Sequence, residues 1–306
     1  MKTVSLIALF AAASLLVTAA TLYTPDKPRA ALEKIYAADS GFTTVLGLRL
    51  HIRDTGPREA PAVILLHGFG SSLQTWNDWQ PALAHNHRVI SLDLPGFGLT
   101  GADASGDYSD ARALAVLLAL MDQLRISKAA FIGNSLGGKL AWLMAATHPE
   151  RVSALVLISP DGYASPGFEY NKPPEVPLAM RLLPYVLPSF MLRPSLASAF
   201  ANPARLTPAL YTRYRDMMLA PGVRRAIVAR LAQVLLLPPE PLLRRITAPT
   251  LLLWGEQDGM IPVTNAADYA TAIPNAKLVT LPNLGHVPQE EAPELTLKPV
   301  AAFLAG

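Results

Sequence analysis

The stretch Gly-Asn-Ser-Leu-Gly-Gly, residues 133–138, stands where an apolar run gives way to a helix-forming one. Residues 128–132 predict a short buried strand, and residues 139–146 consist mostly of good helix formers. A serine between glycines at a strand-to-helix junction is typical of the G-x-S-x-G nucleophile elbow, whose flanking glycines let neighbouring backbone approach closely. The stretch therefore predicts that Ser135 is a nucleophile held on a strained turn.

A serine nucleophile needs a base within hydrogen-bond reach and an acid that orients this base. Residues 250–258 form an apolar run that ends in Asp258, and residues 278–286 form another that ends in His286. The order Ser, Asp, His along the chain is the order expected after such an elbow. We therefore expect His286 to be the general base and Asp258 its acid, with Asp161, which also follows a strand end, as the alternative acid.

Residues 63–70, Val-Ile-Leu-Leu-His-Gly-Phe-Gly, predict a strand that ends in a glycine-containing loop. Such a loop can aim backbone amides at the negative charge that develops on a substrate oxygen. We expect the amides of Phe69 and Leu136 to form this oxyanion hole. An oxyanion hole of this kind requires no particular side chain, so His67 is expected to be structural.

Together these segments resemble the α/β-hydrolase fold family, over roughly residues 42–303. The turn Asp-Leu-Pro-Gly-Phe-Gly at residues 93–98 also matches. The resemblance implies a mostly parallel central sheet flanked by helices, with a helical lid over the serine. The elbow is similar to that of the meta-cleavage-product C–C hydrolases, although those enzymes commonly have an aromatic residue after the catalytic histidine, where this chain has Val287. Ser135 argues against dehalogenases and epoxide hydrolases, which use an aspartate nucleophile.

The resemblance implies a serine hydrolase that cleaves a small-molecule carboxylic ester through an acyl-enzyme, with no cofactor and no metal. The alternatives are C–C bond hydrolysis of a meta-cleavage-type product and a non-catalytic binding protein on the same fold. Residues expected in the substrate pocket are Gly68, Trp76, Asn134 and Val287.

Apolar strands alternate with helical patterns along the chain, which predicts an α/β fold. The expected central strands are residues 89–93, 129–133, 154–159, 250–254 and 277–281, with residues 46–54 as an antiparallel edge strand. The alternation fails over about residues 165–245, where prolines separate short amphipathic stretches at 209–218 and 223–235. This interval is the expected lid.

The composition fits a globular enzyme, because 51% of the 306 residues are hydrophobic and 16% are charged. The chain has no cysteine, which excludes disulfides, a thiol nucleophile and Cys-bound zinc. Its net charge of +3 is small and scattered, so nucleic acid is not an expected partner.

The N-terminus carries a targeting pattern. After Lys2, residues 4–20 contain no charged side chain, and a polar segment follows. We expect residues 1–22 to be a cleaved signal peptide or a membrane anchor, and residues 23–41 to be a tether. Both readings place the catalytic domain outside the cytoplasm, in the periplasm or at the membrane.

Overall fold

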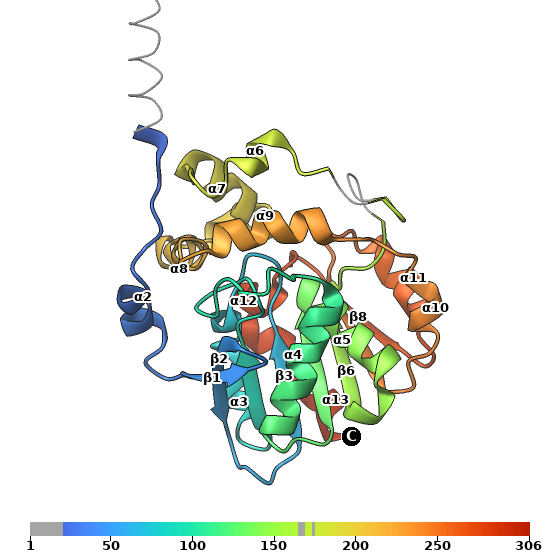
Figure 1. The fold of residues 1–306 in the computed structure, drawn as a ribbon. Coiled ribbons are helices and arrows are strands. Elements are labelled where there is room, and N and C mark those ends of the chain that lie inside the picture. Colours follow the sequence, from blue (N-terminus) through green and yellow to red (C-terminus); the bar gives the residue numbers. More distant parts are fainter. Residues whose placement is uncertain (1–20, 165–168, 173–174) are drawn as a thin grey trace, which may run out of the picture.

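The structure is a computed structural model that describes residues 21–164, 169–172 and 175–306. Its centre is an eight-stranded sheet with the strand order β1-β2-β4-β3-β5-β6-β7-β8 (Figure 1). The strands are β1 (Gly41–Val45), β2 (Leu48–Thr55), β3 (Ala62–Leu66), β4 (Arg88–Leu92), β5 (Ala129–Asn134), β6 (Val152–Ile158), β7 (Thr250–Gly255) and β8 (Lys277–Leu281). The pairs β1–β2 and β2–β4 are antiparallel, and all other pairs are parallel. The predicted fold class is confirmed.

Two layers of helices cover the two faces of the sheet. Side chains alternate between faces along a strand, so Ile64 and Leu66 of β3 enter one core cluster while Val63 and Leu65 enter the other. The first cluster includes side chains of α4 (Asp110–Gln123), α5 (Leu136–Thr147) and α11 (Thr264–Ala272), and the second includes side chains of α3 (Trp79–Leu83) and α13 (Pro293–Ala305). Burial on both faces explains why the parallel strands read as nearly continuous apolar runs.

The strand expected at residues 46–54 begins later, at Leu48. Leu46 and Gly47 form a turn in which both residues have positive φ, 47° and 79°. This turn joins β2 to β1, which lies at the edge of the sheet and was not predicted because its sequence, Gly-Phe-Thr-Thr-Val, is short and half polar.

The interval between β6 and β7 contains α6 (Leu178–Arg181), α7 (Ser189–Ala197), α8 (Pro208–Met218), α9 (Val223–Gln233) and α10 (Glu240–Leu243). The two predicted amphipathic stretches correspond to α8 and α9. Figure 1 shows α6 to α9 as a layer across one end of the sheet. We call residues 178–233 the cap.

Residues 23–41, expected to form a tether, are instead packed against the rest of the protein. The helix α2 (Arg29–Tyr36) buries Leu32 completely in the first core cluster. Before this helix, the Thr24 amide donates to the Tyr185 carbonyl of the cap at 2.8 Å, and the Lys27 ammonium lies 2.6 Å from the Asp216 carboxylate. The prediction of a tether rested on the polarity of the segment alone, and it was wrong because backbone and ionic contacts with the cap hold this segment.

The predicted signal or anchor lies almost wholly in residues 1–20, which are outside the described residues. Among the residues that the structure does describe, none of the helices has the length and apolar character needed to cross a membrane.

Deletion of residues 1–22 is expected to yield soluble protein that retains its activity. The deletion removes the charge-free run but keeps Thr24 and Lys27, which contact the cap, and it keeps every candidate catalytic residue. The solubility and ester turnover of the truncated protein test this prediction. The intact mass of the full-length protein isolated from its host distinguishes cleavage near residues 19–20 from a retained anchor. Collapse of the truncated form, together with uncleaved full-length protein in the cytosol, would show that the segment belongs to the folded core.

Candidate active site

Ser135 lies between the end of β5 and the start of α5, with φ 53° and ψ −118°. This conformation is sterically unfavourable for a residue with a side chain, and the surroundings must hold it in place. The neighbouring glycines show how closely the surrounding backbone approaches the elbow. A Cβ on Gly133 would lie 2.2 Å from the Gly137 carbonyl oxygen, and a Cβ on Gly137 would lie 2.1 Å from the Leu66 carbonyl oxygen. Only glycine fits at either position. Both glycines are therefore required for the tight turn that holds Ser135 at the carboxyl end of the sheet.

His286 and Asp258 form a hydrogen-bonded pair. Nδ1 of His286 donates to Oδ2 of Asp258 at 2.8 Å, and the other carboxylate oxygen accepts from the amides of Met260 and Ile261 at 2.8 and 2.9 Å. The two side chains come from the loops after β8 and β7, and both are almost fully buried. An ionised carboxylate only accepts, so the proton of neutral His286 stays on Nδ1 and Nε2 can act as a base.

The other candidate acid, Asp161, lies beside the elbow, but its contacts are made by its backbone. Its amide donates to the Ser135 carbonyl, and its own carbonyl accepts from Trp142 and Tyr269. Within the described ranges, the Asp161 carboxylate forms no hydrogen bond with a histidine. The geometry therefore pairs His286 with Asp258.

The two amides expected to bind an oxyanion come from the elbow itself and from the loop that contacts it. Leu136 is the first residue of α5, so its amide has no acceptor within the helix and points out of the positive end of the helix dipole. Phe69 follows β3, on a loop that contacts the elbow directly: a Cβ on Gly68 would lie 3.3 Å from the Ser135 Cβ. The arrangement suits stabilisation of a negatively charged oxygen beside Ser135.

His67, expected to be structural, is fully buried and uses both ring nitrogens. Nε2 accepts from the Leu94 amide at 2.9 Å, so the proton is on Nδ1, which donates to the Gly68 carbonyl at 2.7 Å. Burial lowers the pKa of His67 below its ordinary value, so the ring stays neutral. With no nitrogen left for a substrate, His67 positions the oxyanion loop.

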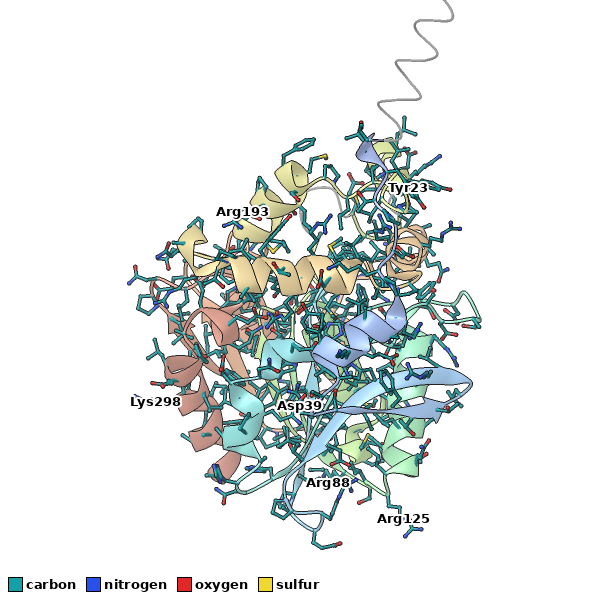
Figure 2. All side chains as sticks on the ribbon, turned by 90° about the vertical axis from the view of Figure 1, so that its left-hand side faces the viewer. Tyr23, Asp39, Arg88, Arg125, Arg193 and Lys298 are labelled. Atoms are coloured by element: carbon teal, nitrogen blue, oxygen red, sulfur yellow. The ribbon has the colours of Figure 1, made fainter. Side chains whose placement is uncertain are left out.

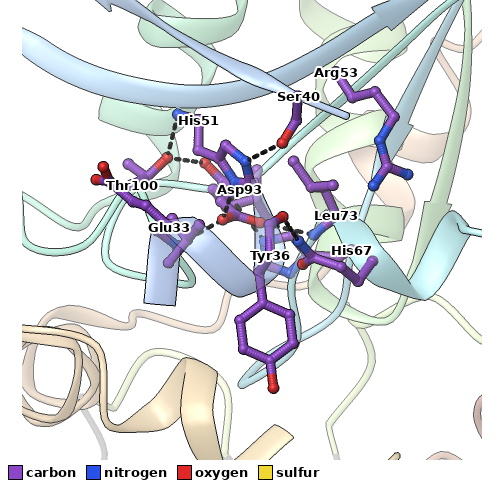
Figure 3. Close-up of polar contacts among 12 residues, drawn as sticks. Glu33, Tyr36, Ser40, His51, Arg53, His67, Leu73, Asp93 and Thr100 are labelled. Atoms are coloured by element: carbon purple, nitrogen blue, oxygen red, sulfur yellow. Dashed lines mark hydrogen bonds and ion pairs between the residues drawn. The ribbon is translucent and has the colours of Figure 1, made fainter. Parts of the chain in front are cut away.

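Asp93 and His51 form a second buried pair, which the sequence did not reveal (Figure 3). Oδ2 of Asp93 accepts from His51 Nδ1 and from the Leu99 amide, each at 2.7 Å, and Oδ1 accepts from the Leu73 amide at 2.7 Å. No local pattern marks this pair, because it is the antiparallel β2–β4 pairing that brings His51 beside the end of β4. The pair lies in the core and ties Leu73, three residues after Gly70, to the turn after β4.

Replacement of Asp93 by Asn is expected to destabilise the protein and to weaken its sensitivity to acid. Burial by itself would raise the pKa of Asp93, but His51 and the amide donors outweigh it and the pKa is lowered. The carboxylate therefore stabilises the fold fully above its unfolded-state pKa of about 3.9, and this contribution is lost as the pH falls through the folded-state pKa. Urea denaturation should show a loss of about 2 kcal/mol at neutral pH. An equal acid dependence in both proteins would contradict this.

Ser135 and His286 line one cavity of about 350 Å³ beneath the cap. Of the residues expected in the pocket, Gly68, Asn134 and Val287 line this cavity and Trp76 does not. Trp76 is fully buried in the second core cluster, with its ring centroid 5.5 Å from that of Trp79. Apolar side chains of the cap contribute much of the lining: Met180, Leu183, Val186, Leu187, Leu192 and Met218.

Two further contacts hold the His286 loop and were not apparent in the sequence. The Asn134 side chain donates to the His286 carbonyl at 2.9 Å, so the residue before the nucleophile also fixes the base. Arg213 of α8 donates two 2.8 Å hydrogen bonds to the buried Glu290 carboxylate in α12 (Pro288–Glu291), directly after the loop. The second contact links the cap to the base through residues 77 positions apart, so no local pattern could have indicated it.

Comparisons with known proteins show the family to which the chain belongs. The profile of a family described as "alpha/beta hydrolase fold" matches residues 61–293. The chain is 32% identical over 82% of its length to the dihydrolipoyllysine-residue acetyltransferase component of the acetoin cleaving system of Pseudomonas putida, and the match spans only 65% of that protein. It is 30% identical over 88% of its length to the 2-hydroxy-6-oxononadienedioate/2-hydroxy-6-oxononatrienedioate hydrolase of Cupriavidus pinatubonensis, covering 96% of that enzyme.

Among solved structures, a membrane phospholipase A described as a bacterial virulence factor superimposes with a TM-score of 0.75 at 28% identity, and the match covers 100% of this chain and 99% of that one. The family profile, the relatives and the sheet with its serine elbow agree, and the chain belongs to the α/β-hydrolase fold family.

Proposed function

We propose that this hydrolase cleaves carboxylic esters through an acyl-enzyme on Ser135. The observation that carries the proposal is the joint placement of Ser135 and the Asp258-paired His286 on one largely apolar cavity.

In the proposed reaction, the Ser135 Oγ attacks the acyl carbon while Nε2 of His286 takes the hydroxyl proton. The carbonyl oxygen becomes negatively charged and is stabilised by the amides of Phe69 and Leu136. The ester C–O bond then breaks, and His286 returns the proton to the leaving alkoxide. His286 next deprotonates a water that attacks the acyl carbon, which releases the carboxylic acid and restores Ser135.

The lining favours an uncharged acyl group over an anionic substrate. The polar side chains on the cavity are those of Ser71, Asn134, Ser135, Ser195, Tyr214 and His286. No lysine or arginine is among the described residues that line it, and the neighbouring Arg213 is committed to Glu290. A buried carboxylate without a cationic partner is strongly unfavourable. An ester with an apolar acyl chain can enter this cavity without that cost.

A second candidate is C–C bond hydrolysis, which is favoured by the relative that acts on 2-hydroxy-6-oxononadienedioate. The name of that compound, a dioate, denotes two carboxylates. The uncharged lining of the cavity therefore disfavours it as a substrate. A panel of p-nitrophenyl esters of graded acyl length, run beside a ring-fission dienone with the same purified enzyme, separates the two. Turnover of the esters with a preference for acyl chains longer than acetyl supports the proposal. Turnover of the dienone alone would replace ester cleavage by C–C hydrolysis, and binding without turnover of either would indicate a non-catalytic protein.

A further inference from the structure

The cap exposes large apolar side chains on its outer surface. We call the following residues of α6, α7 and the segment between them the apolar face: Leu178, Leu182, Tyr185, Phe190 and Met191. Leu178 and Phe190 are about three quarters exposed, at 75% and 74%. Scattered apolar residues are common on protein surfaces, but a group this close along one segment marks an interaction site.

The same cap is strongly basic. Residues 178–233 contain eight arginines and one aspartate, whereas the whole chain has a net charge of only +3, so the remainder of the chain is net negative. Four of these arginines have exposed side chains and no carboxylate partner among the described residues: Arg181, Arg193, Arg205 and Arg225. Apolar side chains among arginines without a carboxylate partner match the chemistry of an anionic lipid surface, which offers hydrocarbon below a layer of negative charge.

The charge-free N-terminal run enters the described structure at this surface. Leu22 and Tyr23 are both exposed, and Tyr23 forms a β-bridge with Val186 beside the apolar face. Figure 2 shows Tyr23 and Arg193 at the same end of the molecule, opposite to Arg88 and Arg125. Residues 4–20, which directly precede this point, carry no charge. The described part of the chain therefore begins beside the surface where the cap is apolar and basic.

The cavity reaches the same surface. Met191 is 57% exposed as part of the apolar face and also lines the cavity that holds Ser135. Its neighbours Val186 and Pro188 line the cavity as well. A substrate that leaves a bilayer at the apolar face would therefore meet apolar side chains from the surface to the serine.

We propose that the apolar face docks on an anionic lipid bilayer and that the cavity takes its acyl-ester substrate from that bilayer. The docking is inferred from the surface residues alone, and only the choice of substrate rests on the proposed ester hydrolysis. The substrate class that fits this arrangement is acyl esters that reside in the bilayer and have a long, uncharged acyl chain.

Labelling at a single introduced thiol tests the docking independently of catalysis, because the chain has no cysteine of its own. Phe190→Cys and the control Lys298→Cys, the latter far from the cap (Figure 2), are made in the full-length chain and labelled with an environment-sensitive fluorophore. Each protein is reconstituted into vesicles of phosphatidylcholine with phosphatidylglycerol and exposed to a water-soluble quencher. We expect several-fold weaker quenching at position 190 than at position 298, and a smaller difference with phosphatidylcholine alone or in high salt.

Equal quenching at the two positions would overturn the docking, and protection that is the same without phosphatidylglycerol would overturn its anionic character. Protection of position 190 in detergent without lipid, together with a dimer in light scattering, would show that a second copy of the chain covers the face. Protection there in a monomer would assign the face to residues 1–20 of the same chain. Each of these two results contradicts docking on lipid.

The substrate step is tested with the double variant Leu178→Asp and Phe190→Asp, since neither residue lines the cavity. Its matched control is Lys298→Glu. We expect the double variant to hydrolyse a soluble p-nitrophenyl ester at the normal rate but to release fatty acid from phosphatidylglycerol vesicles at least about tenfold more slowly, since two apolar contacts with lipid are lost. Equal loss on both substrates, or none on vesicles, would contradict delivery from the bilayer. Failure of the unmodified enzyme on every ester would refute the proposed function and leave the quenching result standing.

Discussion

Replacement of Ser135 by Ala is expected to abolish ester turnover while leaving the fold intact. The serine is the group that attacks the ester in the proposed reaction, and its loss removes the acyl-enzyme route without removing buried apolar contacts. Loss of a triad member in such enzymes lowers the rate by about 10⁴ to 10⁶. Steady-state hydrolysis of a p-nitrophenyl ester by the purified variant measures the loss, and circular dichroism checks the fold.

Ser195→Ala is the matched control, because Ser195 lines the same cavity but its hydroxyl has no place in the proposed chemistry. We expect near-normal turnover from this variant. A fluorophosphonate probe should label Ser135 alone. Near-normal activity of the Ser135→Ala enzyme, or labelling at another serine, would refute the assignment of the nucleophile.

Replacement of Asp258 by Asn has the second largest expected effect, a loss of several thousand-fold in turnover, approaching roughly 10⁴ as in other triads. The Asn carbonyl can still accept from the amides of Met260 and Ile261, as Asp258 Oδ1 does now. Its NH₂ group then faces His286 Nδ1, which must accept. The ring proton moves to Nε2, and His286 can no longer take the proton of Ser135.

Asp161→Asn separates the two candidate acids, since the described contacts of Asp161 are made by its backbone and survive the change. We expect little loss from this variant. The test compares kcat for the two variants over a range of pH on one ester. A large loss for Asp161→Asn beside a small loss for Asp258→Asn would move the acid to Asp161.

Much of the sheet could be predicted because a parallel strand buried on both faces must be apolar at almost every position. The expected strands at 129–133 and 250–254 each differ by one residue from β5 and β7, which are buried along their whole length. The strand β1 was missed because its five residues, Gly-Phe-Thr-Thr-Val, are too few and too polar to form an apolar run. The packed segment before β1 was missed because hydrogen bonds and ion pairs with the cap hold it, and these leave no local pattern.

The sequence by itself indicated the fold family, the candidate nucleophile and base, and two candidate acids, of which Asp258 was preferred. Each of these residues follows a strand, and the carboxyl ends of parallel strands meet at one edge of the sheet, so local patterns sufficed. Only the tertiary structure decided that Asp258 and not Asp161 contacts His286, that Asp93 pairs with His51, and that Trp76 lies in the core. These facts depend on side chains far apart in the chain, whose directions are set by packing after the strands have paired.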